Sequence, residues 1–510
     1  MVFKSLLKNS KKGEVYLGSP EAEADANPNS RVPLSDVYED YHHLIPQLMH
    51  EKFIVVGRKG SGKSAFAEYV WLEAEKEPNL FCQFIKKSEF SLEKVVQLGA
   101  SEGINVDTEA LFKWLIYTNI LKLFAFNEAI SNNKDYELLR QFLKKNSGYI
   151  DIKEYEISEL VKKHGFEVNV EQLKRFVRGK ISKQIEEKSS RAPFYKLLPH
   201  LEEIIKKVLS SQEEIDNKNS YILFFDDLDI DFSVSNKLSC DSLVNLIRAC
   251  RHVNNDIFGK NNLSAKAVIL IRDDIEAFLS SRYADTAKIF SSYSAKINWY
   301  QDDYIHTQNE EDLNIKKFIN KRILYTFRKN MLSVNESDPW SSLVKGSSDN
   351  KSTFKNVLNN TLFRPRDLLL LFKPLENGAY RFPLSRDEIN TLLNNYSDEL
   401  AKELKNELSS FYNSTQIETI FNALGALSND YKSYDLACRV FKENCKEVKS
   451  DEIMSYLFDR SVIGNVDRKG WFTFKCREPL SSPEPYRLDK HQNIAVQYGI
   501  RNYVQHKGYA

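Results

Sequence analysis

The stretch that most restricts the fold is residues 53–66, "FIVVGRKGSGKSAF". Four apolar residues run directly into a loop that holds three of the chain's 18 glycines. The spacing is G-x-x-x-x-G-K-[ST], which is typical of a phosphate-binding loop. It is carried by Gly57, Gly62, Lys63 and Ser64. A plain glycine turn between a strand and a helix is the alternative, but the complete pattern favours the phosphate loop.

The residue types of this loop suit the binding of a nucleotide. Backbone N–H groups surround a phosphate only where the chain curls closely around it, and glycine permits that curl. The helix expected over 64–75 would add its N-terminal dipole. Lys63 would reach the β- and γ-phosphates of ATP, and Ser64 would offer its hydroxyl to Mg²⁺. The expected nucleotide contacts are Gly57, Gly60, Ser61, Gly62, Lys63, Ser64 and Ala65.

A second motif, "SYILFFDDLDI", supplies carboxylates. Its apolar run 221–225 predicts a strand buried on both faces, which ends in Asp226 and Asp227. Mg²⁺ takes oxygen ligands and keeps several waters, so Asp226 is the expected metal residue beside Ser64. Asp227 is the expected catalytic residue that polarises the attacking water, with Asp229 as the alternative. An acidic turn or helix cap is the competing interpretation of these residues.

Further apolar runs alternate with helical patterns. We expect strands over 53–56, 80–86, 267–271 and 295–300, in addition to 221–225. Such alternation predicts an α/β fold, a parallel sheet with helices on both faces. Ligands bind at the carboxyl ends of the strands in sheets of this kind.

Three arginines are expected to act on the γ-phosphate. Arg272 ends the strand 267–271, and Arg366 lies in "RPRD", where Pro365 suits the first turn of a helix. Arg282 follows Arg272 by ten residues and would act on the nucleotide of a neighbouring protomer. Surface salt bridges are the alternative role for all three.

With 510 residues, the chain is too long for one core. We predict a polar lead-in over 1–34 and a P-loop ATPase core over 35–305, which begins with a helix over 36–49. The core carries a helical insertion over about 90–215, whose apolar stripes are expected to be core. A helical lid follows over 306–410, with a polar linker over 334–352. Over 411–510, three helices and a hairpin turning at 467–470 outline a winged helix.

The composition excludes several classes of function. Lys plus Arg number 72 against 71 Asp plus Glu, so net charge gives no hint of a nucleic-acid or membrane partner, and any such site must be a local patch. We expect no membrane span and no secretory signal, because no apolar run is long enough and the first residues lack an apolar core. The six cysteines form no C-x-x-C pair, which favours free thiols in a cytoplasmic protein over structural zinc.

Two local basic groups remain as possible DNA-binding surfaces. The first is in the winged-helix region and comprises Arg439, Lys442, Lys446, Lys449, Arg468 and Lys469. The second is in the helical insertion and comprises Lys174, Arg175, Arg178, Lys180 and Lys183. Such runs are more often solvated helix faces than nucleic-acid contacts.

The motifs "GRKGSGKS", "FFDDLD", "IRDDI" and "RPRDLLLLF" together resemble the AAA+/STAND superfamily of P-loop ATPases. The chain is most similar to origin-recognition-like and KAP-type ATPases and to prokaryotic P-loop ATPases often found in phage-defence systems. The resemblance covers residues 36–380 well and the C-terminal part loosely. It implies an ATPase that uses Mg²⁺. The usual Asp-Glu pair is Asp226-Asp227 here, which implies slow turnover.

Several functions are open at this point. One is an ATP-driven switch that assembles as a homo-oligomer or with an effector protein, in the way of phage-defence ATPases. Another is an initiator or transposition-helper ATPase that binds DNA through its winged helix. A small-molecule kinase is a third, and nothing beyond the phosphate loop favours it.

Overall fold

The computed structural model describes most of the chain. The described residues are 14–86, 107–125, 127, 134–150, 166–176, 190–210, 219–228, 232, 236–301, 304, 309–347, 351–378, 380–409, 411–445, 448–482 and 484–509. The chain forms two compact units. The first comprises Met1–Tyr41, Gly60–Gly62 and Asn298–Ala510, and the second comprises His42–Lys59 and Lys63–Ile297.

The second unit contains the predicted parallel sheet. Its five strands lie in the order β2-β5-β6-β1-β7, and every neighbouring pair is parallel. The strands are β1 (Ile54–Gly57), β2 (Leu80–Lys86), β5 (Ser220–Asp226), β6 (Ala265–Arg272) and β7 (Ser294–Ile297). The predicted α/β fold class is therefore confirmed. The strand expected over 295–300 ends three residues earlier than predicted, so Trp299 and Tyr300 follow it as non-strand residues.

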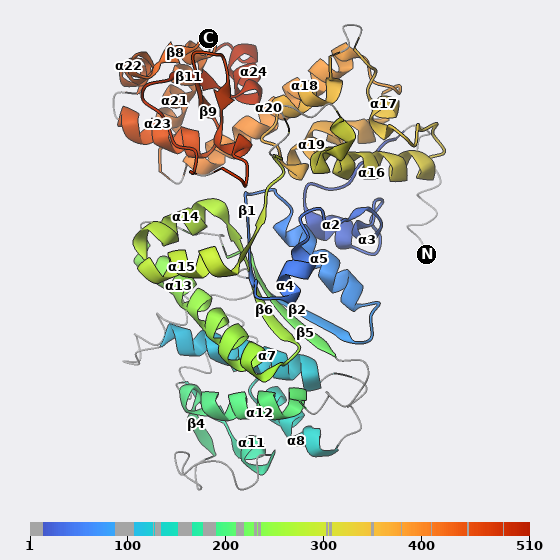
Figure 1. Ribbon diagram of the computed structural model, residues 1–510, viewed down its shortest axis with the longest axis vertical. Helices are drawn as coiled ribbons and strands as arrows, with labels where there is room; N and C mark the ends of the chain where they lie inside the picture. Colours follow the sequence, from blue (N-terminus) through green and yellow to red (C-terminus); the bar gives the residue numbers. More distant parts are fainter. Residues whose placement is uncertain are drawn as a thin grey trace. The chain divides into compact units, whose positions relative to one another are not determined.

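Helices cover both faces of this sheet, because alternate strand residues point to opposite sides. On one face, Phe66 of α5 packs against Phe224 of β5 with ring centroids 5.9 Å apart. On the other, Phe112 of α7 packs against Phe225, 6.5 Å away. Figure 1 shows α7 and α13 beside the strands. The helices of this part are α5 (Lys63–Ala74), α7 (Thr108–Ala125), α13 (Lys237–His252), α14 (Asp273–Arg282) and α15 (Ala284–Tyr293).

The region of the predicted helical insertion is mainly helical in its described part. The two short strands in it pair antiparallel. Its further elements are α8 (Lys134–Lys145), α9 (Ser147–Ile150), β3 (Glu167–Asn169), α11 (Glu171–Phe176), β4 (Arg191–Pro193) and α12 (Leu198–Ser210). The apolar stripes of α7 are buried, with Trp114, Tyr117 and Phe124 each at most 1% exposed. The prediction that these stripes are core is confirmed.

The single helix predicted over 36–49 is wrong. The structure has two short helices instead, α3 (Leu34–Val37) and α4 (Leu44–Met49), and His43 between them has φ 52°. Pro46 explains the break, because proline lacks an N–H and is tolerated only in the first turn of a helix. α4 must therefore begin close before Pro46.

The first unit includes the described part of the predicted lead-in. This segment is packed rather than extended, because Val15, Leu17 and Val32 are at most 3% exposed. Asp25 of α2 (Ala22–Ala26) accepts a 2.9 Å hydrogen bond from Arg322 of α16 (Asn314–Lys329), and both side chains are buried. The sequence predicted a polar lead-in here, but buried apolar residues among the polar ones anchor the described part of this segment.

Helices follow in the part predicted as a lid. They are α17 (Pro339–Leu343), α18 (Thr353–Asn359), α19 (Pro365–Phe372) and α20 (Arg386–Leu408). Pro365 is the first residue of α19, as expected. The stretch 334–352 is not a plain polar linker, because α17 lies in it and Trp340 is 3% exposed. The indole of Trp340 packs edge-on against Phe354 and Phe372.

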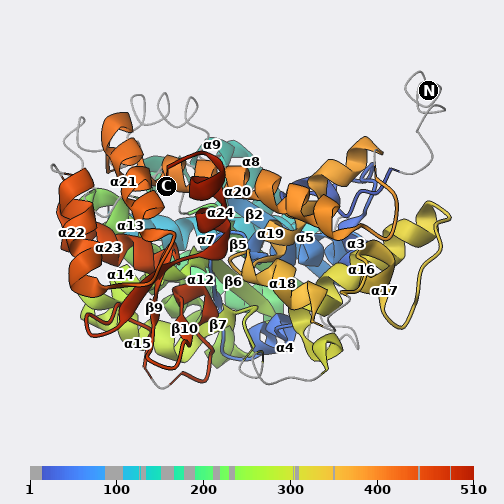
Figure 2. The same cartoon turned by 90° about the horizontal axis from the view of Figure 1, so that it is seen from above.

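The C-terminal region contains the predicted three helices and hairpin. In the hairpin, the Gly470 amide donates to the Asp467 carbonyl, and β10 pairs antiparallel with β9. Two more strands complete a sheet in the order β10-β9-β11-β8. Figure 2 shows α22 and α23 with β9 and β10. The elements are α21 (Ser414–Leu427), β8 (Lys432–Ser433), α22 (Tyr434–Asn444), α23 (Ser450–Asp459), β9 (Ile463–Val466), β10 (Phe472–Thr473), β11 (Asn493–Val496) and α24 (Tyr498–His506).

Two sequence expectations concern the whole chain. No described helix has both the length and the apolar character that a membrane crossing requires. All six cysteines are free thiols, as expected.

Candidate phosphate-loop site

The loop between β1 and α5 has the backbone that its glycines predict. Gly60 and Gly62 have φ values of +76° and +98°, which side chains with a Cβ rarely adopt. A Cβ on Gly62 would meet nothing within 4 Å, so its backbone conformation is what requires glycine. A Cβ on Gly60 would also lie 3.0 Å from the Cβ and Cδ atoms of Arg366.

Lys63 begins α5 and turns its ammonium back over the loop. Its Nζ donates to the carbonyls of Gly57 and Arg58, at 2.9 and 3.2 Å. Ser64 and Ala65 follow in the first turn of α5 and are half-buried. The first-turn N–H groups of a helix have no intrahelical partner, so this turn suits an anion.

Asp226 is the last residue of β5, and its side chain is buried. One oxygen, Oδ1, accepts the Asp227 amide at 2.8 Å. The other, Oδ2, is buried and has no hydrogen-bond partner among the described residues. Burial raises the pKa of Asp226, while the Asp227 amide, the Ser64 hydroxyl and the charges of Lys63 and Lys86 act to lower it.

Asp227 leaves the strand with φ 57°, an unusual conformation for a residue other than glycine. Aspartate and asparagine tolerate this region better than most residues. Such strain often accompanies functional sites. Asp229, the alternative catalytic acid, lies outside the described residues.

Sequence reasoning missed a second cation at this edge of the sheet. Lys86 ends β2 and lies in register with Asp226 of β5. Its Nζ is 3.2 Å from Oε1 of Glu68 on α5, and both side chains are largely buried. The only signal in the sequence was the position of Lys86 at the end of a predicted strand.

Arg272 lies where the sequence predicted, at the carboxyl end of β6 and in register with Gly57 of β1. Its guanidinium forms an ion pair with Asp274, with Nη2 to Oδ2 2.5 Å. Arg282 is at the opposite end of α14, about 15 Å away along the helix axis. It is exposed, and its guanidinium lies over the Phe278 ring. The structure therefore brings Arg272 beside the loop's first glycine but keeps Arg282 apart from Arg272.

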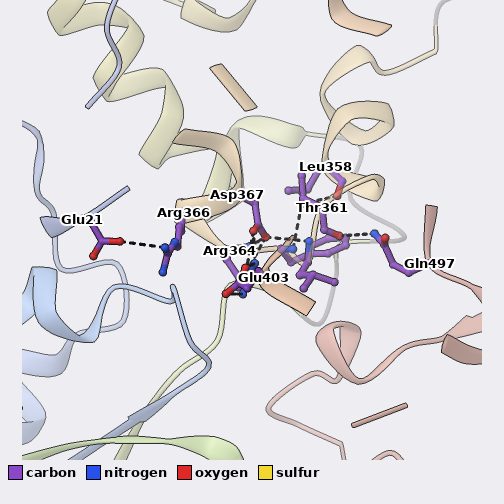
Figure 3. Close-up of polar contacts among 10 residues, drawn as sticks. Glu21, Leu358, Thr361, Arg364, Arg366, Asp367, Glu403 and Gln497 are labelled. Carbon is purple, nitrogen blue, oxygen red and sulfur yellow. Dashed lines mark hydrogen bonds and ion pairs between the residues drawn. The ribbon is translucent and has the colours of Figure 1, made fainter. Parts of the chain in front are cut away.

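Arg366 is the second residue of α19, in the first unit. Its Nη2 donates to Glu21 at 3.0 Å, and its Nε is buried without a hydrogen-bond partner among the described residues. Figure 3 shows this pair next to a second group of charges.

That second group fixes the start of α19, and sequence reasoning missed it. Arg364 is 5% exposed and forms ion pairs with Asp367 at 2.6 Å and with Glu403 of α20 at 3.0 Å. Burial alone would lower the pKa of Arg364, but the two carboxylates hold it well above its usual value. Gln497 donates to the Thr361 carbonyl at 3.0 Å, as Figure 3 also shows. The backbone that carries Arg366 is thus firmly positioned.

The donor set of the second unit fits Mg²⁺. Mg²⁺ prefers oxygen ligands and uses one or two carboxylates together with substrate phosphates. The buried Oδ2 of Asp226 is an oxygen without a partner, and the Ser64 hydroxyl acts on the same carboxyl group. Among the described residues, no group of three or more His, Cys, Asp or Glu side chains is arranged to hold a metal ion by itself.

No family model and no curated protein matches the chain. The ORC2 protein of Aeropyrum pernix, solved as ADPNP-ADP complexes, is similar with 10% identity, covering 95% of this chain and 98% of that one, at a TM-score of 0.36. Cdc6p from Pyrobaculum aerophilum is similar with 10% identity over 96% and 99% of the two chains, at a TM-score of 0.28. The fold class rests on the chain's own strands and loop.

Proposed function

We propose that this protein binds ATP with Mg²⁺ and hydrolyses it slowly. The observation that carries the proposal is the occurrence in one unit of two features. The Lys63 ammonium turns back over the glycine loop, and the buried carboxyl of Asp226 has an oxygen, Oδ2, without a hydrogen-bond partner among the described residues. A loop with two left-handed glycines and a helix start offers several N–H donors at close range. Asp226 adds one negative charge suited to a divalent cation.

Each residue has a role in this proposal. Lys63 exchanges its two carbonyl partners for phosphate oxygens, which carry full charge and accept more strongly. Ser64 and Asp226 would hold Mg²⁺, and the bound ion would supply positive charge that neutralises the phosphates. Asp227 orients and polarises the attacking water. Arg272 exchanges Asp274 for the γ-phosphate.

The slow rate and the regulatory role are inferences from the same residues. Aspartate is one methylene shorter than the glutamate that usually follows the metal carboxylate, so Asp227 holds the water less closely. We propose that ATP binding is therefore a switch, with Arg366 acting from the lid and Arg282 acting on a neighbouring protomer. A partner effector and a place in phage defence rest on the sequence resemblance alone.

Calorimetry with ATP and Mg²⁺ tests nucleotide binding. Lys63→Ala should abolish measurable binding, because the phosphates lose their fixed cation. Lys266→Ala is a matched control, since this lysine near the amino end of β6 also donates to a backbone carbonyl, that of His50. Equal affinity in wild type and Lys63→Ala would refute the proposal.

DNA binding by the C-terminal region is a second candidate. Arg439, Lys442, Arg468 and Lys469 are exposed and form no ion pair with a described residue. Lys449 differs, because it pairs with Glu452 at 2.7 Å. Lys446 of the first basic group, and Arg178, Lys180 and Lys183 of the second, lie outside the described residues. Affinity that falls steeply with salt in fluorescence anisotropy would support this function.

A further inference from the structure

The tip of the phosphate loop has a partner that no motif suggests. Trp299 Nε1 donates a 2.8 Å hydrogen bond to the backbone carbonyl of Ser61, and both residues are buried. Trp299 and Gly60–Gly62 belong to the same compact unit. The indole lies two residues beyond β7 and packs edge-on against Tyr41 and Phe318, with ring centroids 5.8 and 5.7 Å away.

This hydrogen bond controls the direction of one loop amide. The Ser61 carbonyl and the Gly62 N–H belong to one trans peptide plane, so they point in opposite directions. Fixing the carbonyl on the indole therefore aims the Gly62 N–H away from the indole. That amide lies directly before Lys63 and is among the donors that a phosphate loop uses.

Without the indole, this peptide plane would have little to hold it. Gly62 has no side chain, and a Cβ there would meet nothing within 4 Å, so no side-chain contact at Gly62 restrains the plane. A buried carbonyl without a partner is unfavourable, and rotation toward water would relieve it. The same rotation would turn the Gly62 N–H away from its present direction.

We propose that Trp299 is a positioning residue for the phosphate loop, because its indole N–H holds the Ser61–Gly62 peptide in the orientation that binds a β-phosphate. The inference rests on the proposed nucleotide binding and adds a residue to it. Trp299 does not touch the nucleotide in this proposal. It sets the fraction of loops that are ready to bind, and apparent affinity falls in proportion to that fraction.

Trp299→Phe tests the role, because phenylalanine keeps an aromatic ring between Tyr41 and Phe318 but has no N–H. If only about a tenth of loops remain competent, the Kd for ADP with Mg²⁺ rises about tenfold in calorimetry. The matched control is Trp114→Phe, which removes a 2.9 Å indole bond to the Tyr149 carbonyl, within the helical insertion. The control should bind ADP within about twofold of wild type.

The outcomes separate this inference from the proposed function. If wild type binds ADP and Lys63→Ala does not, nucleotide binding stands, and a Trp299→Phe Kd within about twofold of wild type overturns the role of Trp299. If Trp299→Phe and Trp114→Phe weaken binding equally, the effect is general destabilisation and the role is also overturned. If wild type binds no ADP, the proposed function and the inference fail together.

A second measurement keeps the proposal testable if Trp299→Phe does not fold. The chain has five tryptophans, at 71, 114, 299, 340 and 471. In protein labelled with 5-fluorotryptophan, single replacements of the other four assign their ¹⁹F resonances and leave that of Trp299. ADP with Mg²⁺ should shift the Trp299 resonance in wild type and leave it unchanged in Lys63→Ala. A Trp299 resonance that stays fixed at saturating ADP overturns the proposal.

Discussion

Replacing Asp226 with asparagine should stabilise the protein in the absence of nucleotide and Mg²⁺. Asp226 is 3% exposed, and its Oδ2 has no partner among the described residues. Burial raises the pKa of this carboxyl despite the Asp227 amide, the Ser64 hydroxyl and the charges of Lys63 and Lys86, so the ionised form is less favourable in the folded than in the unfolded chain. Asparagine keeps the Oδ1 acceptor for the Asp227 amide and removes the charge.

The expected gain in the free energy of unfolding follows from the burial of this one polar group. A buried acceptor without a partner lowers the free energy of unfolding by about 1–3 kcal/mol, and a charged acceptor lowers it more. The asparagine side chain of the variant still leaves one neutral group unsatisfied, so only part of this cost is recovered. A net gain of about 1–2 kcal/mol corresponds to a rise in Tm of about 2–8 °C for a unit of this size. Differential scanning calorimetry at pH 8 with EDTA measures it.

The change of this stability difference with pH is a second test, because the direction of the change is determined by the raised pKa of Asp226. An acid whose folded pKa is raised contributes stability below its unfolded pKa and loses that contribution as pH rises through its folded pKa. Wild type and Asp226→Asn should therefore melt together near pH 4 and separate as pH rises, with the variant higher. ATP with Mg²⁺ should reverse the order, because bound ligand stabilises only the protein that binds it.

Asp367→Asn is the matched control, because it makes the same chemical change at a buried aspartate that has partners. Asp367 accepts hydrogen bonds from the Arg364 guanidinium and from the Leu362 and Arg364 amides. Breaking a buried ion pair costs about 3–5 kcal/mol, so its Tm should fall. If Asp226→Asn melts at or below wild type at pH 8 without ligand, the reasoning about its unsatisfied carboxyl is refuted.

Two further predictions concern turnover and assembly. Asp227→Asn should keep its backbone conformation, since asparagine tolerates φ 57°. The variant should bind ATP, while its rate of phosphate release falls about a hundredfold. Unchanged release in a phosphate assay would make Asp229 or another acid the base. Light scattering should show a larger or more compact species with ATP and Mg²⁺, and Arg366→Ala should weaken that response. Arg282→Ala should weaken it only if protomers share a site, and equal mass and radius with and without ATP would leave a monomeric ATPase.

The sheet and the loop could be predicted because local pattern determines them. Four of the five strands were located to within about two residues, since buried parallel strands are continuous apolar runs. The curled backbone of the loop between β1 and α5 could be predicted because the spacing of its glycines reflects the backbone conformation directly. The predicted end of β7 is wrong because the aromatic residues Trp299 and Tyr300 follow the strand closely and resemble a continuation of it in the sequence.

The contacts around the loop could not be predicted, because they join residues far apart in the chain. Ser61 and Trp299 are 238 positions apart, and Arg366 meets Glu21 across 345. Neither pair has a fixed spacing that a pattern could detect. The ion pair between Asp25 and Arg322 could not be predicted either, for the same reason. Asp25 lies in a segment whose composition predicts a polar lead-in, yet this aspartate anchors the segment.

The properties of Arg366 and Trp299 differ in a way that bears on the switch. Arg366 holds Glu21 by an exposed contact, and an exposed ion pair contributes at most about 1 kcal/mol, so a phosphate can displace it readily. Trp299 holds Ser61 by a buried hydrogen bond, and its indole packs against aromatic neighbours such as Tyr41. A phosphate does not compete for this hydrogen bond. In the proposed switch, Arg366 would exchange its partner when nucleotide binds, and Trp299 would keep the loop's shape. A mutation of Arg366 should therefore alter the response to ATP more than the affinity for ADP, whereas a mutation of Trp299 should weaken the binding of both nucleotides alike.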